Sequence, residues 1–190
     1  MIPKEEIANI LDILEKAKIA IEERNPVNLN ELSNRTIHTA SIEQDTDSIL
    51  LAVIIYSLSK IIERGQYKEL PGWNKFYSNY KLRIEIAEKA LKEGDEEKFF
   101  KSLKEIQNSI SNLSGSLKSS IKDVFQKARI NKASKIYEHG ISMEKTADLL
   151  GITLWELASY AGQKSDPESE KYSRTESAKA RIKIAMEMFS

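Results

Sequence analysis

The sequence contains no cysteine, and its 190 residues include only 7 glycines and 4 prolines. Without cysteine the chain can form no disulfide bond, no cysteine-ligated zinc site and no thiol nucleophile. This absence fits a reducing compartment, and we expect the protein in the cytoplasm. Because glycine and proline are sparse, long stretches lack the residues that interrupt helices, which favours an all-α fold over a turn-rich β fold.

The chain also lacks a hydrophobic run long enough for a membrane span. Its most apolar stretch, Ile49 to Tyr56, is far shorter than the roughly 20 residues that cross a bilayer. The opening sequence MIPKEEIANILDILEK interrupts its apolar pattern with acidic residues, unlike a signal peptide. We therefore expect no membrane contact, and we predict that this apolar stretch forms a buried core helix.

The charges balance overall but are unevenly distributed. Lysine plus arginine and aspartate plus glutamate both total 29, so no net field draws the protein onto nucleic acid. Residues 118–135 nevertheless carry six basic residues against Asp123, and residues 171–183 carry five against Glu176. These segments are either nucleic-acid-binding surfaces or ordinary solvated helix faces, and the sequence leaves both interpretations open.

Apolar residues three and four positions apart predict helices along most of the chain. The predicted helices lie within residues 7–25, 27–44, 46–64, 73–91, 96–113, 117–138 and 175–189. The turn-forming sequence Leu113-Ser114-Gly115-Ser116 predicts a domain boundary. We predict an all-α protein with an N-terminal helical bundle (1–113), a helix-turn-helix part (117–162), a linker (163–174) and a C-terminal helix (175–190).

The most specific motif is ASKIYEHGISMEKTADLLGITLWELASYAG, which spans residues 133–162. Gly140 is placed to end an incoming helix, and Ser142 is placed to cap a short one. Gly151 then supplies a sharp turn, and Thr153 is placed to cap a second helix. Two short helices joined by a turn that contains glycine predict a helix-turn-helix.

This stretch resembles the helix-turn-helix of small archaeal and bacterial antitoxin-type proteins encoded beside PIN-domain toxin nucleases. The matching elements are Tyr137, Gly140-Ile141-Ser142, the run from Ala147 to Thr153, and Trp155-Glu156. The resemblance is confined to residues 133–162, and it implies binding to DNA or to a toxin protein.

The second helix of the motif carries few groups that recognise bases. Residues 153–160 contain no arginine or lysine, the usual partners of guanine, and we expect Glu156 to point outward. Contact with nucleic acid would therefore rely on the phosphate backbone and on residues outside this helix. The candidate nucleic-acid-binding residues are Lys122, Lys127, Arg129, Lys132, Lys145, Ser159, Gln163 and Lys164.

A second group of polar residues precedes the most apolar helix. It consists of Arg35, His38, Glu43, Asp45 and Asp47. The group could be a nuclease site, could contain a histidine that is phosphorylated, or could bind a hard cation. Against the first hypothesis, the spacing between Arg35 and His38 is too short for the catalytic pair of helical-bundle ribonucleases. A network of polar contacts and helix caps accounts for it more simply, so we predict no catalytic residue, metal or cofactor.

These observations favour a non-enzymatic regulatory protein associated with DNA or RNA. Alternatively, the helix-turn-helix could serve as a docking module of a protein or ribosome assembly factor. A helical nuclease or phosphotransfer protein centred on His38 is the third hypothesis. We expect a homodimer, with the bundle available to bind a protein partner.

Overall fold

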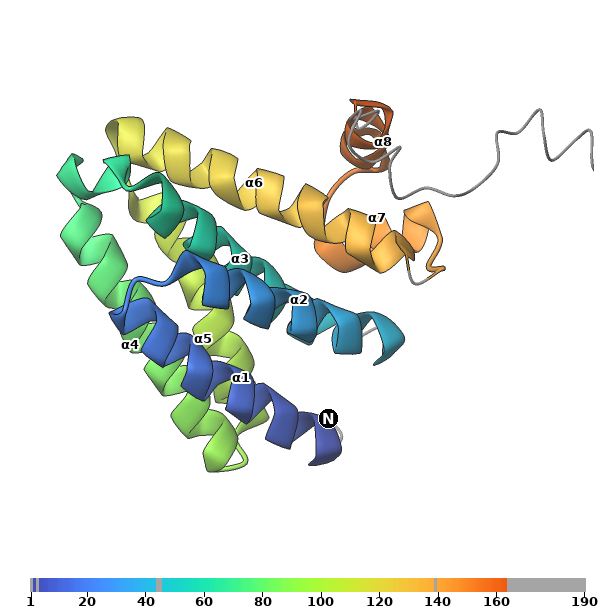
Figure 1. The fold of residues 1–190 in the computed structure, drawn as a ribbon, viewed down its shortest axis with the longest axis horizontal. Coiled ribbons are helices and arrows are strands. Elements are labelled where there is room, and N and C mark those ends of the chain that lie inside the picture. The colour runs from blue at the N-terminus through green and yellow to red at the C-terminus, as the bar shows by residue number, and fades with distance from the viewer. Residues whose placement is uncertain (1, 3, 44–45, 139, 164–190) are drawn as a thin grey trace, which may run out of the picture. The chain divides into compact units, whose positions relative to one another are not determined.

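The computed structural model describes residues 2, 4–43, 46–138 and 140–163 (Figure 1). The predicted all-α class is confirmed: these residues form eight α-helices and two short 3₁₀ helices, with no strand among them. The α-helices are α1 (Lys4–Glu22), α2 (Pro26–Glu43), α3 (Thr46–Arg64), α4 (Trp73–Lys92), α5 (Glu96–Ser109), α6 (Gly115–Glu138), α7 (Met143–Leu150) and α8 (Leu154–Gln163). The 3₁₀ helices are η1 (Gln66–Glu69) and η2 (Ile110–Asn112).

The chain divides into two compact units, residues 1–157 and residues 158–190. Within the second unit the structure describes residues 158–163, the C-terminal part of α8. The predicted linker beyond Gln163 and the predicted C-terminal helix lie outside the described residues. No helix in the part of the chain that the structure describes is both long and apolar enough to cross a membrane.

The main hydrophobic core of the first unit draws on six helices. One buried residue from each of α1 to α6 is Ile13, Leu29, Leu51, Phe76, Phe99 and Ile121. Leu117 and Ile121 belong to this core although both follow Leu113, where the sequence predicts a domain boundary. The N-terminal half of α6 is therefore part of the bundle, and the structure does not separate the two predicted parts at that point.

A second core lies around the C-terminal half of α6. It joins Ile37 of α2 and Ile49 of α3 to Ile136 of α6, Leu149 of α7 and Leu157 of α8. Helices α2, α3 and α6 contribute to both cores, and together they connect α7 and the start of α8 to the bundle (Figure 1).

Helix α3 is buried over most of its surface. All five residues from Leu51 to Ile55 are buried, and α2, α5, α6 and α7 each pack against the helix. Neighbouring polar groups are satisfied by its backbone: the Ser33 hydroxyl donates to the Ala52 carbonyl (2.6 Å) and the Tyr80 hydroxyl donates to the Ile54 carbonyl (2.6 Å). Burial also raises the pKa of Tyr80 well above its usual value.

An ion-pair network links α1 to α4. Glu88 is buried and pairs with Lys18 and with Lys92 (2.7 Å), and Lys92 also contacts Glu15 (2.7 Å). Burial alone would raise the pKa of Glu88, but hydrogen bonds from Lys18 and Lys92 outweigh it and hold that pKa below its usual value. The carboxylate is thus stabilised in its ionised form.

We expect Glu88→Gln to lower the free energy of unfolding by about 1–2 kcal/mol at neutral pH, as measured by urea denaturation. Because folding lowers the pKa of Glu88, its contribution is present above the unfolded pKa of about 4.3 and is lost as pH falls through the folded value. The difference between wild type and variant should therefore shrink at about pH 3.

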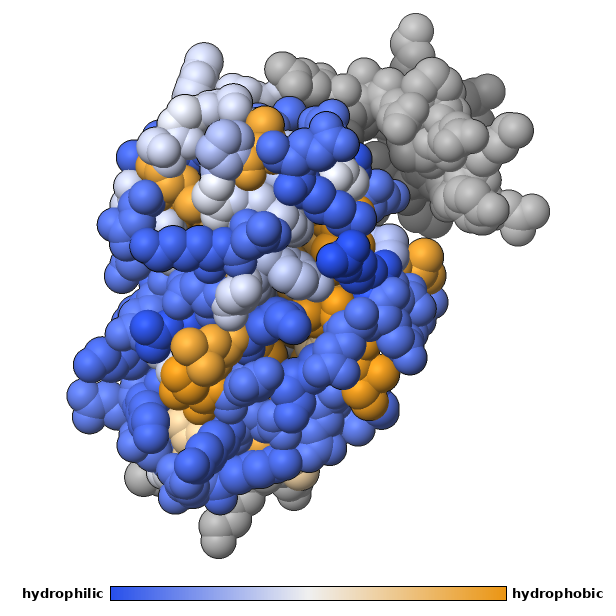
Figure 2. Space-filling view, turned by 90° about the vertical axis from the view of Figure 1, so that its left-hand side faces the viewer, coloured by the Kyte–Doolittle hydropathy of each residue, from blue (hydrophilic) through white to orange (hydrophobic). Residues whose placement is uncertain are grey.

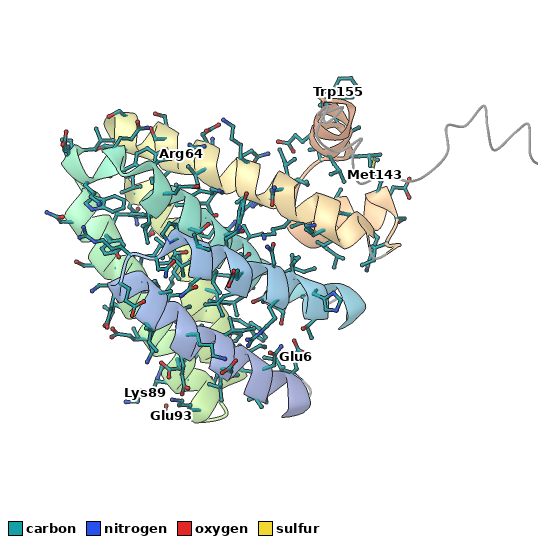
Figure 3. The ribbon with its side chains drawn as sticks, viewed as in Figure 1. Glu6, Arg64, Lys89, Glu93, Met143 and Trp155 are labelled. Carbon is teal, nitrogen blue, oxygen red and sulfur yellow. The ribbon has the colours of Figure 1, made fainter. Side chains whose placement is uncertain are left out.

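Glu93→Gln is the matched control at the end of the same helix (Figure 3). The Glu93 side chain is 51% exposed and lies 3.9 Å from Lys89, so its loss should change stability by less than about 0.5 kcal/mol. Equal effects of the two substitutions would contradict the role of the buried network.

Candidate functional site

The segment around α7 is fixed by the two caps that the sequence predicts. The Ser142 hydroxyl accepts a hydrogen bond from the Lys145 amide (3.2 Å) at the start of α7. At its end Gly151 is left-handed (φ 60°, ψ 41°), a conformation that glycine adopts without a Cβ clash. The Ile152 amide then donates to the Ala147 carbonyl (3.1 Å), and Ile152 is buried.

A reciprocal cap begins α8. The Glu156 amide donates to the Thr153 hydroxyl (3.1 Å), while the Glu156 carboxylate accepts from the Thr153 amide (2.8 Å) and from Gln126 of α6 (2.7 Å). Donation from the Thr153 backbone and hydroxyl lowers the pKa of Glu156. Glu156, expected from the sequence to point outward, is therefore bound to its own helix end and to α6.

The outward side of α8 is apolar instead. Trp155 is 81% exposed and its neighbour Leu154 is 44% exposed, whereas Leu157 is buried. The Trp155 side chain points away from the ribbon (Figure 3). In the second unit, Ala158 and Ser159 are exposed too. The motif includes Trp155, but nothing in its pattern predicts this exposure.

Three of the candidate basic residues are accessible. Lys122 and Lys127 of α6 and Lys145 of α7 are exposed, and Lys127 forms an ion pair with Asp123 (2.9 Å). Lys122 lies one helical turn before Gln126, the residue that contacts α8, so both are on the same side of α6. The cation that acts on the first turn of α8 is Arg129 of α6, whose charge adds to the effect of the Thr153 hydrogen bonds and lowers the pKa of Glu156 further.

Two other candidates are partly or fully buried. Arg129 is half-buried, and desolvation lowers its pKa although Glu156 acts in the opposite direction. Lys132 is 0% exposed, with its ammonium 2.9 Å from the Asn34 amide oxygen and 4.2 Å from the centre of the Tyr56 ring. Lys132 was predicted to contact a nucleic-acid backbone, but it points into the helix packing and presents no surface to a ligand.

The last candidates lie at the end of the described residues. Ser159 is exposed on α8. Gln163 is described as the last residue of α8 but not in its side chain, and Lys164 lies outside the described residues.

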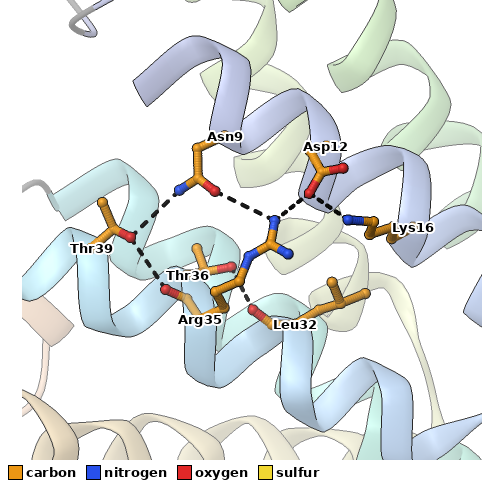
Figure 4. Close-up of polar contacts among 7 residues, drawn as sticks. All are labelled: Asn9, Asp12, Lys16, Leu32, Arg35, Thr36 and Thr39. Carbon is orange, nitrogen blue, oxygen red and sulfur yellow. Dashed lines mark hydrogen bonds and ion pairs between the residues drawn. The ribbon is translucent and has the colours of Figure 1, made fainter. Parts of the chain in front are cut away.

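Arg35 of the predicted polar group has partners on α1. Its guanidinium pairs with Asp12 and donates to the Asn9 side-chain oxygen (3.4 Å), while Lys16 pairs with Asp12 at 2.8 Å (Figure 4). The Lys16 and Arg35 hydrogen bonds lower the pKa of Asp12. These contacts thus link the exposed faces of α1 and α2.

Of the rest of that polar group, the structure describes the side chain of His38 alone. His38 is exposed on α2. The side chains of Glu43 and Asp47 and the whole of Asp45 lie outside what the structure describes. Among the described residues, no group of three or more histidine, aspartate or glutamate side chains is placed to hold a metal ion.

No protein-family model, curated protein or solved structure matches this chain. The side chains themselves are therefore the basis for a functional proposal.

The buried Lys132 predicts an unusual pH dependence of stability. Desolvation, with Lys135 and Lys60 nearby, lowers the pKa of Lys132 to about 7. The pKa of this lysine in the unfolded chain is about 10.4. Between about pH 7 and that value the unfolded chain therefore binds more protons than the folded one. The free energy of unfolding should then rise by on the order of 1 kcal/mol for each pH unit. In Lys132→Met this rise should disappear when free energies of unfolding are measured from pH 7 to 9.

Lys127→Met provides the control on the same helix, because Lys127 is exposed. It should keep the wild-type pH profile. An unchanged profile in Lys132→Met would mean that the lysine remains protonated throughout this pH range.

Proposed function

We propose that this chain is a non-enzymatic docking protein, and that α7 and α8 form a helix-turn-helix unit whose second helix binds a protein partner. The observation that carries the proposal is the 81% exposure of Trp155. An aromatic side chain buries roughly 150–250 Å² when it enters a pocket, and tryptophan is enriched among the residues that dominate protein interfaces. Leu154 extends the same apolar surface.

The helix-turn-helix assignment is supported by three local features. These are the Ser142 cap on α7, the left-handed Gly151 between the helices and the reciprocal Thr153–Glu156 cap on α8. Each is characteristic of a sharp connection between two short helices. The resemblance to antitoxin-type proteins, which bind toxin proteins as well as DNA, favours the same assignment.

The chemistry of α8 favours a protein over a base sequence. No cation lies between Thr153 and Tyr160, and the Glu156 carboxylate is engaged by Thr153 and Gln126. A specific major-groove contact needs side chains that pair with base edges, which this face lacks. Because Lys122 and Lys127 are exposed on α6, the helix that Gln126 joins to the start of α8, we propose that the partner offers an apolar pocket bordered by acidic residues.

The test uses the difference between the two tryptophans. Trp73 is buried and Trp155 is exposed, so Trp73→Phe leaves Trp155 as the single tryptophan of the chain. Partners retained from nuclease-treated cell extract would be identified, purified and titrated against this variant. We expect a blue shift of Trp155 emission on binding, and at least a tenfold loss of affinity in Trp155→Ala.

Leu82→Ala on α4 is the matched control, because Leu82 is an exposed apolar residue (50%) away from α8. It should bind like the wild type. If Trp155→Ala converts a dimer into a monomer, the partner is a second copy of the chain. Unchanged affinity and unchanged emission would refute docking through α8.

A second candidate function is contact with a nucleic-acid backbone, favoured by the exposure of Lys122, Lys127 and Lys145. Replacing all three with glutamate should weaken binding to a labelled DNA duplex by at least about tenfold. The slope of log affinity against log salt should also fall by about 0.9 for each phosphate that the variant no longer neutralises.

The control for this experiment is the same charge reversal on α4 and α5, at Lys89, Lys98 and Lys101, which are also exposed. It should leave duplex binding in place. Equal losses in the two triple variants would show that only overall charge matters and would exclude a defined backbone site on α6 and α7.

A further inference from the structure

A cavity of about 570 Å³ lies between the beginning of α4 and the end of α5. Its walls include Lys75, Asn79 and Arg83 from α4 and Asn108 from α5, and the segment from Asn112 to Ser114 completes it. Cavities of roughly 300–1,000 Å³ accommodate small molecules. This cavity is on different helices from the α8 surface, so its function is independent of the docking proposal.

Three asparagine side chains line the cavity. Among the described residues, the side chains of Asn79, Asn108 and Asn112 make no hydrogen bond. Each amide offers two donor hydrogens and one acceptor oxygen, a combination suited to hydroxyl groups. Three such groups around one cavity can hold a polar molecule by several hydrogen bonds at once.

The charge of the cavity favours an anion. Arg83 pairs with Glu105, but its Nε atom is buried and has no hydrogen-bond partner within the described part of the chain. Lys75 is exposed and forms no ion pair there, so the lining carries one uncompensated positive charge. At the start of α4 the Trp73 amide donates to the Leu70 carbonyl (3.1 Å), and Gly72 has no side chain to cap the amides that follow.

We propose that this cavity binds a small phosphorylated molecule that carries hydroxyl groups. The Lys75 ammonium and the Lys75 backbone amide bind the phosphate, and the three asparagine amides pair with the hydroxyls. Phe76 and Leu113 supply an apolar surface against which the carbon skeleton rests. The proposal requires no chemical change in the ligand.

Ribose 5-phosphate is the probe, added to the full ¹⁵N-labelled chain and followed by NMR. We expect saturable shifts of the side-chain amides of Asn79, Asn108 and Asn112 and of the Lys75 backbone amide. Ribose without phosphate should shift none of them. Lys75→Met should weaken binding by at least about tenfold, because a charged hydrogen bond to the phosphate is lost.

Lys89→Met is the matched control at the opposite end of α4, where the side chain is 75% exposed (Figure 3). It should bind the probe with wild-type affinity, and both variants should keep the wild-type helical content. The proposal is overturned if these amides show no saturable shift up to about 10 mM ribose 5-phosphate. Equal affinity in Lys75→Met and wild type would also overturn it.

Discussion

The burial of α3 is the constraint on which the rest of the first unit depends. A helix with apolar groups on every side cannot leave one face in water, so its neighbours must enclose it. The run from Leu51 to Ile55 meets this condition, and α2, α5, α6 and α7 pack against it. The hydroxyl groups that face α3 donate to its carbonyls, which removes the cost of burying them. Elsewhere the surface is mostly hydrophilic, with separate apolar patches on the face shown in Figure 2.

Within the described residues, local signals predicted the helices and several of their ends correctly. Spacing of apolar residues identifies a helix because it reports which side is buried, and the caps at Ser142 and Gly151 depend on neighbouring residues alone. The boundary predicted after Leu113 has no such local basis. A turn in the sequence indicates that the chain changes direction there. Whether Leu117, after the turn, belongs to the main hydrophobic core depends instead on contacts with residues distant in sequence.

The candidate site was less predictable because charge does not report burial. Lys132 was grouped with the exposed lysines of α6, yet it lies four residues from both Ala128 and Ile136, which are buried on one helix face. That spacing was the available signal for its burial. Glu156 was interpreted as an outward acid, whereas its place three residues after Thr153 matches a reciprocal helix cap. No feature of the sequence indicates that Trp155 is exposed, because an apolar residue in an amphipathic helix is ordinarily expected to be buried.

Helix α6 has a mechanical consequence because it is one uninterrupted element. It runs for 24 residues, or about 36 Å at 1.5 Å per residue, and a continuous ladder of backbone hydrogen bonds resists stretching along its axis. Its first turn follows directly on Ser114 in the cavity wall, and Gln126 farther along holds the first turn of α8. The helix therefore acts as a strut between these two places, and because its buried residues are packed in both cores, an axial shift of the helix would require the core to rearrange.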